Sequence, residues 1–372
     1  MNILLLNYEY PPIGGGAGTA TYNYAQEFVK LRHNVVIITS AFGSLYEYNN
    51  NNGVHLYRVP ALRMHQDRSN PLQMLAYNFS SILFSKKIIN RHKINHVIAF
   101  MSIPSGITAY IIKKLFAKEY MIFLGGGDVP GSQIHLNTYH KVVSPIRKAV
   151  LRNAKYIIAC SDGLGRLSYK TDKYPTTTIT VGVDIDYFKP RIKAGNDIVF
   201  VFVGRFSLVK NVEYIIKEFA LLAKEYENVH LNLVGDGPFY EKVYALQKEL
   251  KIEDKVTFFG WVDKAKVRDI YNQSDCIINA SDAEGLSNTN LEAMSSGLAA
   301  IVSDVTGNND LIVHEMNGLL FPLKEGALYE AMKRITTDKK LLNSLKKKSR
   351  EEVCKNYTMK RSAQNYIDLM RG

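Results

Sequence analysis

Short, uninterrupted apolar runs alternate with longer helical patterns along this chain, and this rhythm constrains the fold more than any other feature. The runs of the first half lie at 2–6, 34–39, 96–100, 120–124 and 156–160. A helical pattern over 21–31 separates the first two. Strands that are apolar at every position are buried on both faces. The pattern therefore predicts parallel sheets covered by helices and joined by right-handed crossovers.

The same rhythm restarts after an irregular segment. Gly182, Pro190 and Gly195 interrupt the pattern, as glycine and proline do between elements, so a domain boundary is predicted near 185–195. The predicted strands beyond it lie at 198–203, 230–234, 256–259, 276–279 and 299–303, with helices at 212–225 and 291–296. A chain of 372 residues is long enough for two such domains. We predict α/β domains over 1–188 and 189–354, facing each other across a cleft, and a C-terminal helix over 355–372 that packs back on the first.

The net charge and the cysteines limit which partners and which compartment are expected. Lysine and arginine number 47 against 35 aspartate and glutamate, a formal charge of +12, which favours an anionic partner such as a phosphorylated small molecule or an acidic membrane surface. No nucleic-acid-binding motif is present, so no nucleic-acid partner is predicted. Three cysteines far apart predict neither disulfides nor a zinc cluster, and fit a cytoplasmic protein. No run approaches the roughly 20 apolar residues that span a bilayer, so any membrane contact is expected to be peripheral.

A glycine-rich loop follows the first predicted strand. Gly14, Gly15, Gly16 and Gly18 precede a helix, where backbone N–H groups and the helix dipole can hold an anion. A dinucleotide-binding loop would need a further glycine at position 19 and an acidic residue after the second strand, but the chain has Thr19 at the first and Thr39 and Ser40 at the second. NAD binding is therefore disfavoured, and phosphate or sugar contact is preferred to a purely structural turn.

Two carboxylates are spaced by seven residues in the second half. Glu284 falls in a predicted loop and Glu292 in the first turns of the next helix, with Ser287, Asn288 and Thr289 as capping candidates. A loop carboxylate beside a helix N-terminus can hold sugar hydroxyls while the amides hold a phosphate. Taken alone, Glu292 is also explained as a charge that the helix dipole favours.

Basic side chains follow the first strand of the same half. Arg205 and Lys210 come just after the run at 198–203, and arginine can grip phosphate oxygens in a bidentate manner. The loops at 233–238 and 258–262 follow neighbouring strands. Ligands of parallel sheets bind at the carboxyl ends of the strands, so these loops are candidates for base and ribose contacts.

These motifs together resemble one enzyme family. The sequence is similar to retaining glycosyltransferases of family 4, with the GT-B architecture of two Rossmann-like domains. The resemblance runs through YPPIGGG, VGRFSLVKN, LVGDGP, the Glu284-x7-Glu292 segment and NGLLFP at 317–322. It implies that 1–188 binds the acceptor, that 189–354 binds a nucleotide sugar, and that no cofactor or metal is needed.

The resemblance also implies roles for single residues. Glu284, Arg205 and Lys210 match the catalytic positions: Glu284 would hold hydroxyls of the transferred sugar, and the basic pair the diphosphate. Glu292 matches the carboxylate on the donor ribose. The full donor set is Gly15, Gly16, Gly204, Arg205, Lys210, Gly235, Gly260, Val262, Glu284, Gly285, Leu286, Ser287, Asn288, Thr289 and Glu292. The family mechanism is a front-face displacement, in which the leaving diphosphate helps to deprotonate the acceptor.

The chain departs from the family pattern on the acceptor side. Gly125 stands where many relatives carry histidine or arginine, which leaves Gly126 and Asp128 as the acceptor candidates. Val181 replaces a common asparagine. The Asp184-Ile185-Asp186 triplet imitates a metal-binding motif, but it lies in the interdomain segment and is expected to be structural.

The predicted activity is transfer of a hexose from a UDP-sugar, with GDP as the second candidate, to a sugar hydroxyl. The acceptor is expected to be a lipid-linked precursor of a cell-surface polysaccharide or another glycan, because basic and aromatic residues interleave over 63–93, as on surfaces that contact anionic membranes. A solvated helix face explains that charge equally well. The alternative functions are a sugar-nucleotide epimerase of the same fold and a non-catalytic sugar-nucleotide- or glycan-binding protein, with a dehydrogenase a distant fourth.

Overall fold

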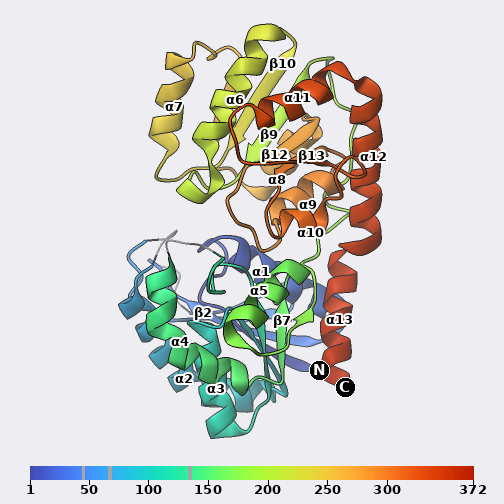
Figure 1. Ribbon diagram of the computed structural model, residues 1–372. Coiled ribbons are helices and arrows are strands. Elements are labelled where there is room, and N and C mark those ends of the chain that lie inside the picture. The colour runs from blue at the N-terminus through green and yellow to red at the C-terminus, as the bar shows by residue number, and fades with distance from the viewer. Residues whose placement is uncertain (44–46, 66–68, 133–135) are drawn as a thin grey trace. The chain divides into compact units, whose positions relative to one another are not determined.

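The computed structural model describes residues 1–43, 47–65, 69–132 and 136–372. The chain divides into two compact units (Figure 1). Unit 1 comprises Met1–Val181 and Met359–Gly372, and unit 2 comprises Gly182–Thr358. The chain thus leaves unit 1 seven residues before the predicted boundary at 188/189, and returns to it four residues after 354/355.

Unit 1 is built on an eight-stranded sheet in the order β3-β4-β2-β1-β5-β6-β7-β8. Its strands are β1 (Asn2–Leu6), β2 (Asn34–Ser40), β3 (Glu47–Asn51), β4 (Val54–Val59), β5 (His96–Phe100), β6 (Tyr120–Leu124), β7 (Tyr156–Ala159) and β8 (Thr177–Thr178). All pairs are parallel except β3 with β4. The central strands are buried along most of their length, as their uninterrupted apolar sequences predict.

Helices cover the sheet of unit 1. They are α1 (Gly16–Lys30), α2 (Pro71–His92), α3 (Ser105–Phe116), α4 (Asn137–Arg152), α5 (Asp162–Asp172) and the C-terminal α13 (Met359–Arg371). Helix α13 packs on α1: the rings of Tyr24 and Tyr366 meet edge to face with centroids 5.0 Å apart, and the Tyr24 hydroxyl lies 2.6 Å from Ser362 Oγ. The last segment of the chain therefore belongs to the core of unit 1.

Unit 2 contains a six-stranded parallel sheet in the order β11-β10-β9-β12-β13-β14. Its strands are β9 (Ile198–Val203), β10 (Val229–Val234), β11 (Val256–Gly260), β12 (Cys276–Asn279), β13 (Ala299–Ser303) and β14 (Leu319–Phe321). Its helices are η2 (Leu208–Lys210), α6 (Val212–Glu225), α7 (Tyr240–Glu249), α8 (Lys264–Asn272), α9 (Asn288–Ser295), α10 (Asn308–Leu311), α11 (Ala327–Thr337) and α12 (Lys339–Asn356). A buried core that includes Phe200, Phe219 and Met332 joins sheet and helices.

The strands predicted from apolar runs are confirmed, with bounds within one residue. The sequence pattern missed β3, whose sequence EYNNN is polar and which pairs antiparallel at the edge of the sheet. It also missed β4, where buried and partly exposed residues are mixed, and the short strands β8 and β14. It also started α1 too late, since the helix begins at Gly16 inside the glycine loop. Within the described ranges, no helix has the length and apolar character needed to cross a membrane.

Candidate functional site

The carboxyl ends of the strands of unit 2 gather the residues predicted to bind a nucleotide sugar. Because β9, β10, β11 and β12 run parallel, the loops that follow them lie at one edge of the sheet. These loops carry, in strand order, Arg205 and Lys210, Gly235, Val262, and Glu284. This is the edge at which α/β sheets bind ligands.

The first two of these loops pack against each other through glycines. The Gly204 N–H donates to Val234 O at 3.0 Å, and the Gly235 N–H donates to Gly260 O at 2.8 Å. Gly235 has φ +126°, and a Cβ there would lie 1.9 Å from Gly204 O. No side chain fits at position 235 without moving the loop that carries Arg205. Close backbone packing therefore requires this glycine.

The short helix η2 positions Lys210 at the end of the loop after β9. Asn211 follows in the left-handed conformation with φ 51°, and its side-chain amide donates to Ala280 O at 3.0 Å and to Asp282 Oδ1 at 2.7 Å. The Asp282 N–H in turn donates to Val209 O at 2.9 Å. These three bonds fasten the Lys210 loop to the Glu284 loop. Arg205 lies on the same loop with an exposed side chain.

Lys210 and Glu284, two of the three predicted catalytic residues, are in contact. Lys210 Nζ donates to Glu284 Oε1 in a charge-assisted hydrogen bond. The same oxygen accepts from Ser281 Oγ at 2.8 Å and from Asn279 Nδ2 at 3.1 Å. Burial raises the pKa of Glu284, but Lys210 and the two neutral donors outweigh it, so the pKa lies below its ordinary value. The carboxylate is therefore ionised at neutral pH, and every bond described here engages its Oε1 atom.

A buried network of amides and hydroxyls lies behind Glu284. Asn279 Nδ2 is also 3.3 Å from Ser287 Oγ and 3.4 Å from Asn290 Oδ1. Asn290 donates to Asn308 Oδ1 at 3.1 Å, and Asn308 donates to the backbone oxygen of Ser303 at 3.1 Å. All five side chains are buried. Such networks hold their members in one geometry when their donors and acceptors are satisfied, so Glu284 is supported from strands β12 and β13 and from α9 and α10.

The N-terminus of α9 lies directly after the Glu284 loop. Ser287 is its N-cap and accepts from the Asn290 N–H at 3.3 Å, which confirms one of the three predicted capping candidates. Gly307, with φ +86°, supports the loop from the other side: a Cβ there would lie 2.5 Å from Gly285 O. The segment from Gly285 to Thr289 thus begins a helix whose first amides are oriented by the N-cap and by the strand β13 loop.

Glu292, the second carboxylate of the pair, is half-buried on α9. Burial raises its pKa to about 7, against the opposing effect of Lys264. The loop after β11 carries Val262 and the only tryptophan of the chain, Trp261, whose side chain is exposed. Glu292 is therefore a carboxylate that titrates near neutral pH, unlike Glu284.

The glycine loop of unit 1 contains a carboxylate that the sequence reasoning missed. The Gly15 N–H donates to Glu9 Oε2 at 3.2 Å, and α1 has neither a side-chain N-cap nor an acidic residue in its first turn. A Cβ on Gly14, which has φ +88°, would lie 2.5 Å from the Glu9 side chain. The anion that meets this loop is therefore one of the protein's own side chains. The signal was an acidic residue five positions before a glycine run.

The acceptor candidates Gly126 and Asp128 also lie in unit 1. Asp128 is buried, and its carboxylate accepts from the Gly125 and Gly126 N–H groups at 3.1 and 3.3 Å and from the Ser102 N–H at 3.0 Å. The buried Arg147 lies 4.0 Å from Asp128 Oδ2 and bonds Asp172 at 2.8 Å. In these contacts Asp128 fixes its own loop; its part in acceptor binding stays a prediction.

The Asp184-Ile185-Asp186 triplet forms a turn. Asp184 Oδ1 accepts from the Asp186 N–H at 3.1 Å and from the Tyr187 N–H at 3.0 Å. Over the parts of the chain that the structure describes, no three histidine, cysteine, aspartate or glutamate side chains are grouped as they would be to hold a metal ion.

The sequence pattern did not reveal the support of Glu284. Asn279 and Ser281 lie just before the Glu284-x7-Glu292 segment, Asn290 lies inside it and Asn308 lies 16 residues after it, and nothing in the motif marks them as a network. The available signal was a polar residue at the end of an otherwise apolar strand: Asn279 ends β12 and Ser303 ends β13.

Solved structures share this fold over the full chain. A sucrose-phosphate synthase from Thermosynechococcus elongatus superposes with a TM-score of 0.86 at 19% sequence identity, covering 100% of this chain and 98% of that one. The Anabaena protein HepE, in complex with UDP and glucose, superposes with a TM-score of 0.78 at 18% identity, covering 100% of both chains. The two parallel α/β sheets thus define a GT-B fold, as predicted.

Family models assign the chain more narrowly. Residues 14–187 match the model for Glycosyltransferase Family 4, and residues 184–352 match that for glycosyl transferases group 1. The chain belongs to this family, the group 1 and family 4 glycosyltransferases, which confirms the predicted resemblance. It is a glycosyltransferase that uses nucleotide sugars.

Two curated relatives share nearly the whole length at low identity, and a third shares about half of it. An uncharacterized glycosyltransferase of Methanocaldococcus jannaschii is 23% identical and covers 100% of this chain and 98% of its own. The N-acetyl-alpha-D-glucosaminyl L-malate synthase of Bacillus anthracis is 25% identical, with 96% and 93% covered. An Escherichia coli UDP-Gal:alpha-D-GlcNAc-diphosphoundecaprenol alpha-1,3-galactosyltransferase is 30% identical over 53% of this chain and 54% of its own.

Proposed function

We propose that this enzyme transfers a hexose from a nucleoside diphosphate sugar to a sugar hydroxyl, with retention of anomeric configuration. The observation that carries the proposal is the contact of Lys210 with Glu284 at the carboxyl edge of the sheet in unit 2. A cation beside an ionised carboxylate supports the proposal, because a cation suits a diphosphate and a carboxylate suits the hydroxyls of a sugar.

In this proposal Arg205 and Lys210 stabilise the charge that develops on the leaving diphosphate, and the amides of Gly285 to Thr289 assist them. The bond between the anomeric carbon and the diphosphate oxygen breaks, and a bond to the acceptor oxygen forms on the same face. The acceptor proton passes to a diphosphate oxygen. Glu284 holds the sugar through its hydroxyls, and no protein carboxylate forms a covalent bond to it.

The remaining donor contacts follow the loops. Glu292 accepts from the ribose hydroxyls, and the segment Gly260 to Val262 contacts the base. Gly204 and Gly235 let the backbone approach the nucleotide, and Leu286 lies in the segment beside the sugar. Gly15 and Gly16 of unit 1 remain proposed donor contacts, with the Gly15 N–H exchanging Glu9 Oε2 for the ligand. Arg205 and Lys210 supply the positive charge at the diphosphate, so we propose a reaction that needs no metal ion.

We propose UDP as the nucleotide of the donor sugar, with GDP as the second candidate. The E. coli relative is named for UDP-Gal, and HepE was solved with UDP; both facts concern those proteins and support the choice here. The acceptor proposed is a lipid-linked glycan precursor bound by unit 1, at the cytoplasmic face of the cell membrane, with Gly126 and Asp128 as acceptor-side candidates.

The first experiment uses Trp261 as an internal probe of nucleotide binding. Because it is the only tryptophan and lies in the proposed base loop, UDP should change its fluorescence saturably, whereas NAD should not. UDP at a hundred times its Kd should also raise the free energy of unfolding by about 2.7 kcal/mol. Trp261→Phe removes the fluorescence signal and serves as its control in the thermal measurement. If UDP, GDP, ADP and CDP all gave no response in either measurement, the proposal of a donor site in unit 2 would be wrong.

The second experiment separates transfer from its alternatives. The enzyme is incubated with UDP-hexoses, with and without EDTA, and with membrane lipid extracts as acceptor. A transferase releases UDP and labels a glycan, an epimerase changes the sugar while it stays on UDP, and a binding protein does neither. UDP release in the presence of EDTA supports the metal-free reaction, and loss of activity with EDTA contradicts it.

A further inference from the structure

Helix α2 of unit 1 exposes large apolar residues along its first half and buries several polar ones. Leu72, Leu75, Phe79 and Leu83 follow one another at steps of three and four residues, so they lie along one face of the helix. Their side chains are 74%, 59%, 72% and 67% exposed. We call these four residues the apolar stripe. A helix at the surface of a water-soluble protein normally turns its apolar residues toward the core and its polar residues toward water.

The inward face of α2 carries several hydrogen-bonded polar groups, with the apolar Ile88 and Ile89 only in its last turns. Asn78 and Ser81 are buried, and both are joined to Thr108 of α3, each by a bond of 2.9 Å. Tyr77 is buried as well and donates from its hydroxyl to Ile38 O at 3.2 Å. These bonds fix the rotation of the helix about its axis. The apolar stripe therefore cannot turn inward without leaving buried polar groups without partners, which is costly.

The last two turns of the same helix are basic. Lys86 and Lys87 follow the apolar stripe, and Arg91 lies one turn beyond them. No aspartate or glutamate occurs between Pro71 and His92. Among the side chains that the structure describes, the ion pairs include none with Lys86, Lys87 or Arg91. The outer surface of α2 is thus apolar along its first three turns and positively charged after them.

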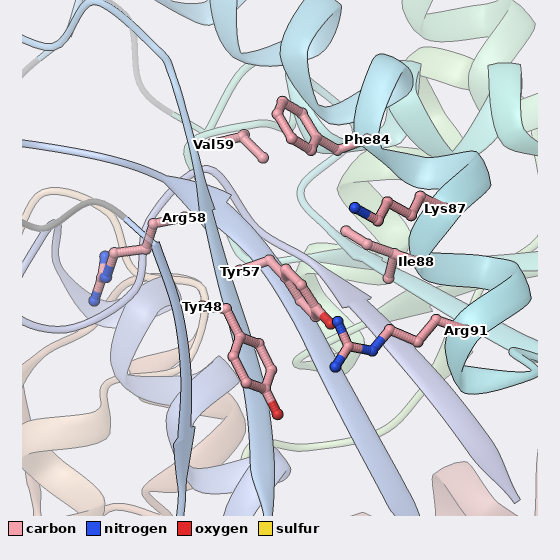
Figure 2. A pocket seen from close by; sticks show the side chains of 8 residues that line it. All are labelled: Tyr48, Tyr57, Arg58, Val59, Phe84, Lys87, Ile88 and Arg91. Carbon is pink, nitrogen blue, oxygen red and sulfur yellow. The ribbon is translucent and has the colours of Figure 1, made fainter.

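A pocket of about 440 Å³ opens beside the basic end of α2 (Figure 2). One wall is Phe84, Lys87, Ile88 and Arg91 of α2, and the other is formed by Tyr48, Tyr57, Arg58 and Val59 of β3 and β4. In Figure 2 the charged ends of Lys87 and Arg91 extend from α2 toward the strands, while Arg58 points away. Arg58 is instead bonded to Pro11 O at 2.6 Å and to Ser40 O at 3.3 Å. The two cations of α2 and the aromatic rings therefore define the pocket's chemistry.

Two further apolar side chains are exposed in the loop that leads from β4 to α2. Leu62 and Met64 are 75% and 72% exposed. They flank Arg63, whose guanidinium lies over the ring of Tyr8 at 4.6 Å, and Tyr8 packs edge to face on Tyr77 of α2. Arg63 thus links this loop, through Tyr8, to the first half of α2.

We propose that α2 docks the enzyme on an anionic lipid bilayer. The apolar stripe enters the boundary between headgroups and acyl chains, Lys86 lies at the headgroup level, and the pocket holds the phosphate of an anionic phospholipid between Lys87 and Arg91. Charge complementarity favours a bilayer over a second copy of this chain, because two copies joined face to face on α2 would bring like charges together. A helix that joins an apolar face to unopposed basic residues is typical of interfacial binding.

The test is sedimentation of the full-length protein with phosphatidylcholine vesicles that contain 30% phosphatidylglycerol, at low salt. The wild-type protein should sediment with these vesicles and stay in the supernatant with pure phosphatidylcholine. L75S/F79S should lower the partition coefficient at least tenfold, and K86Q/K87Q about 25-fold, at about fivefold for each lysine. K347Q/K348Q, on the exposed face of α12 in unit 2, removes the same charge elsewhere and should bind like wild type.

Every outcome is decisive for this surface. A wild-type protein that stays in the supernatant, or an L75S/F79S variant that sediments fully, overturns the proposal. Equal losses in K86Q/K87Q and K347Q/K348Q show attraction by net charge only and also overturn it. A wild-type dimer that L75S/F79S converts to a monomer, without vesicle binding, assigns the apolar stripe to a second copy instead. Circular dichroism and thermal unfolding check that each variant is folded. Vesicle binding needs no nucleotide, so this proposal and the proposed transfer reaction can fail independently.

Discussion

Lys210 Nζ and Glu284 Oε1 form a charge-assisted hydrogen bond between the loop after β9 and the loop after β12. The two residues are 74 positions apart in sequence, yet the parallel order of β9 and β12 brings their loops together. The side chain of Lys210 is 26% exposed and that of Glu284 is 12% exposed. The pair is thus mostly shielded from water but still accessible, which suits the charged ligand proposed above.

Removing the cation of this pair should impair activity more than stability. We expect Lys210→Ala to lower kcat by about 10²- to 10³-fold, the range found when one donor to a developing negative charge is lost. Unfolding should become easier by only about 1–2 kcal/mol, less than for a fully buried pair, because Asn279 and Ser281 still bond Glu284 and water reaches the site. Steady-state UDP release and urea unfolding measure the two effects.

Lys217→Ala is the matched control for that variant. Lys217 lies on α6, seven residues further on, with an exposed side chain, so its removal should leave both kcat and the unfolding free energy nearly unchanged. Glu284→Ala should resemble Lys210→Ala in kcat. Near-normal turnover of either site variant would remove that residue from the catalytic set.

Asn279 should act on the reaction through Glu284. Asn279→Ala deletes one of the donors to Oε1 and the links to Ser287 and α9, so we expect kcat/KM for the donor to fall about 10- to 100-fold. Asn279→Asp places a second carboxylate beside Glu284, and like charges raise a carboxyl pKa. The acidic limb of its pH–rate profile should therefore move to higher pH, which a purely structural effect would not cause.

Asn272→Ala provides the comparison for Asn279. Asn272 is equally buried in unit 2, where it accepts from the Arg191 N–H at 2.9 Å and donates to Arg268 O at 3.0 Å. Its loss should lower stability to a similar extent. If it also lowered kcat/KM per folded molecule as much as Asn279→Ala, the special role of Asn279 would be disproved.

Much of the fold could be predicted because the parallel sheets bury strands on both faces. Ile3 to Leu6 of β1 and Ala299 to Val302 of β13 are apolar and buried throughout, and such runs are visible in sequence. Strand β3 escaped prediction because it is a polar edge strand, held by its antiparallel partner rather than by a core. Helix α2 shows the limit most clearly: apolar character alone would have turned Leu75 and Phe79 inward, whereas the bonds of Asn78 and Ser81 to Thr108 orient it the other way.

The candidate site, too, could be predicted only in part. Lys210 and Glu284 could be predicted to lie near each other, since both follow strands of one parallel sheet. Their support could not, because the bonds among Asn279, Asn290 and Asn308 depend on side-chain geometry across three elements. Glu9 was missed for the same reason: its contact with Gly15 depends on the path of the loop between β1 and α1.

The glycines at the strand ends make a separate prediction about packing. Gly235→Ala places a methyl group against Gly204 O and should destabilise unit 2 by about 1–3 kcal/mol beyond the cost of its φ. Gly260→Ala is the control: its φ is +63°, but a Cβ there would meet no atom within 4 Å, so only the conformational cost of about 1–2 kcal/mol applies. Urea unfolding of both variants gives the difference, and equal losses would contradict the packing argument.

Glu292 should make stability and nucleotide binding depend on pH in opposite directions. Its pKa is raised to about 7 by burial, so between about pH 4.5 and 7 the native state keeps a proton that the unfolded chain has released. The unfolding free energy should therefore fall as pH rises through this window and level off above it. Glu292→Gln is neutral at every pH, and its stability relative to wild type should rise by roughly 1–3 kcal/mol from pH 5 to pH 8. Ribose hydroxyls prefer the ionised carboxylate, so UDP should bind the wild-type protein more tightly at pH 8 than at pH 6. The difference should be smaller in Glu292→Gln, where only the second ionisation of the UDP phosphate, with a pKa of about 6, contributes. Urea unfolding and Trp261 fluorescence titrations at the two ends of the range measure both effects, and parallel stability profiles for the two proteins would show that Glu292 is not the titrating group.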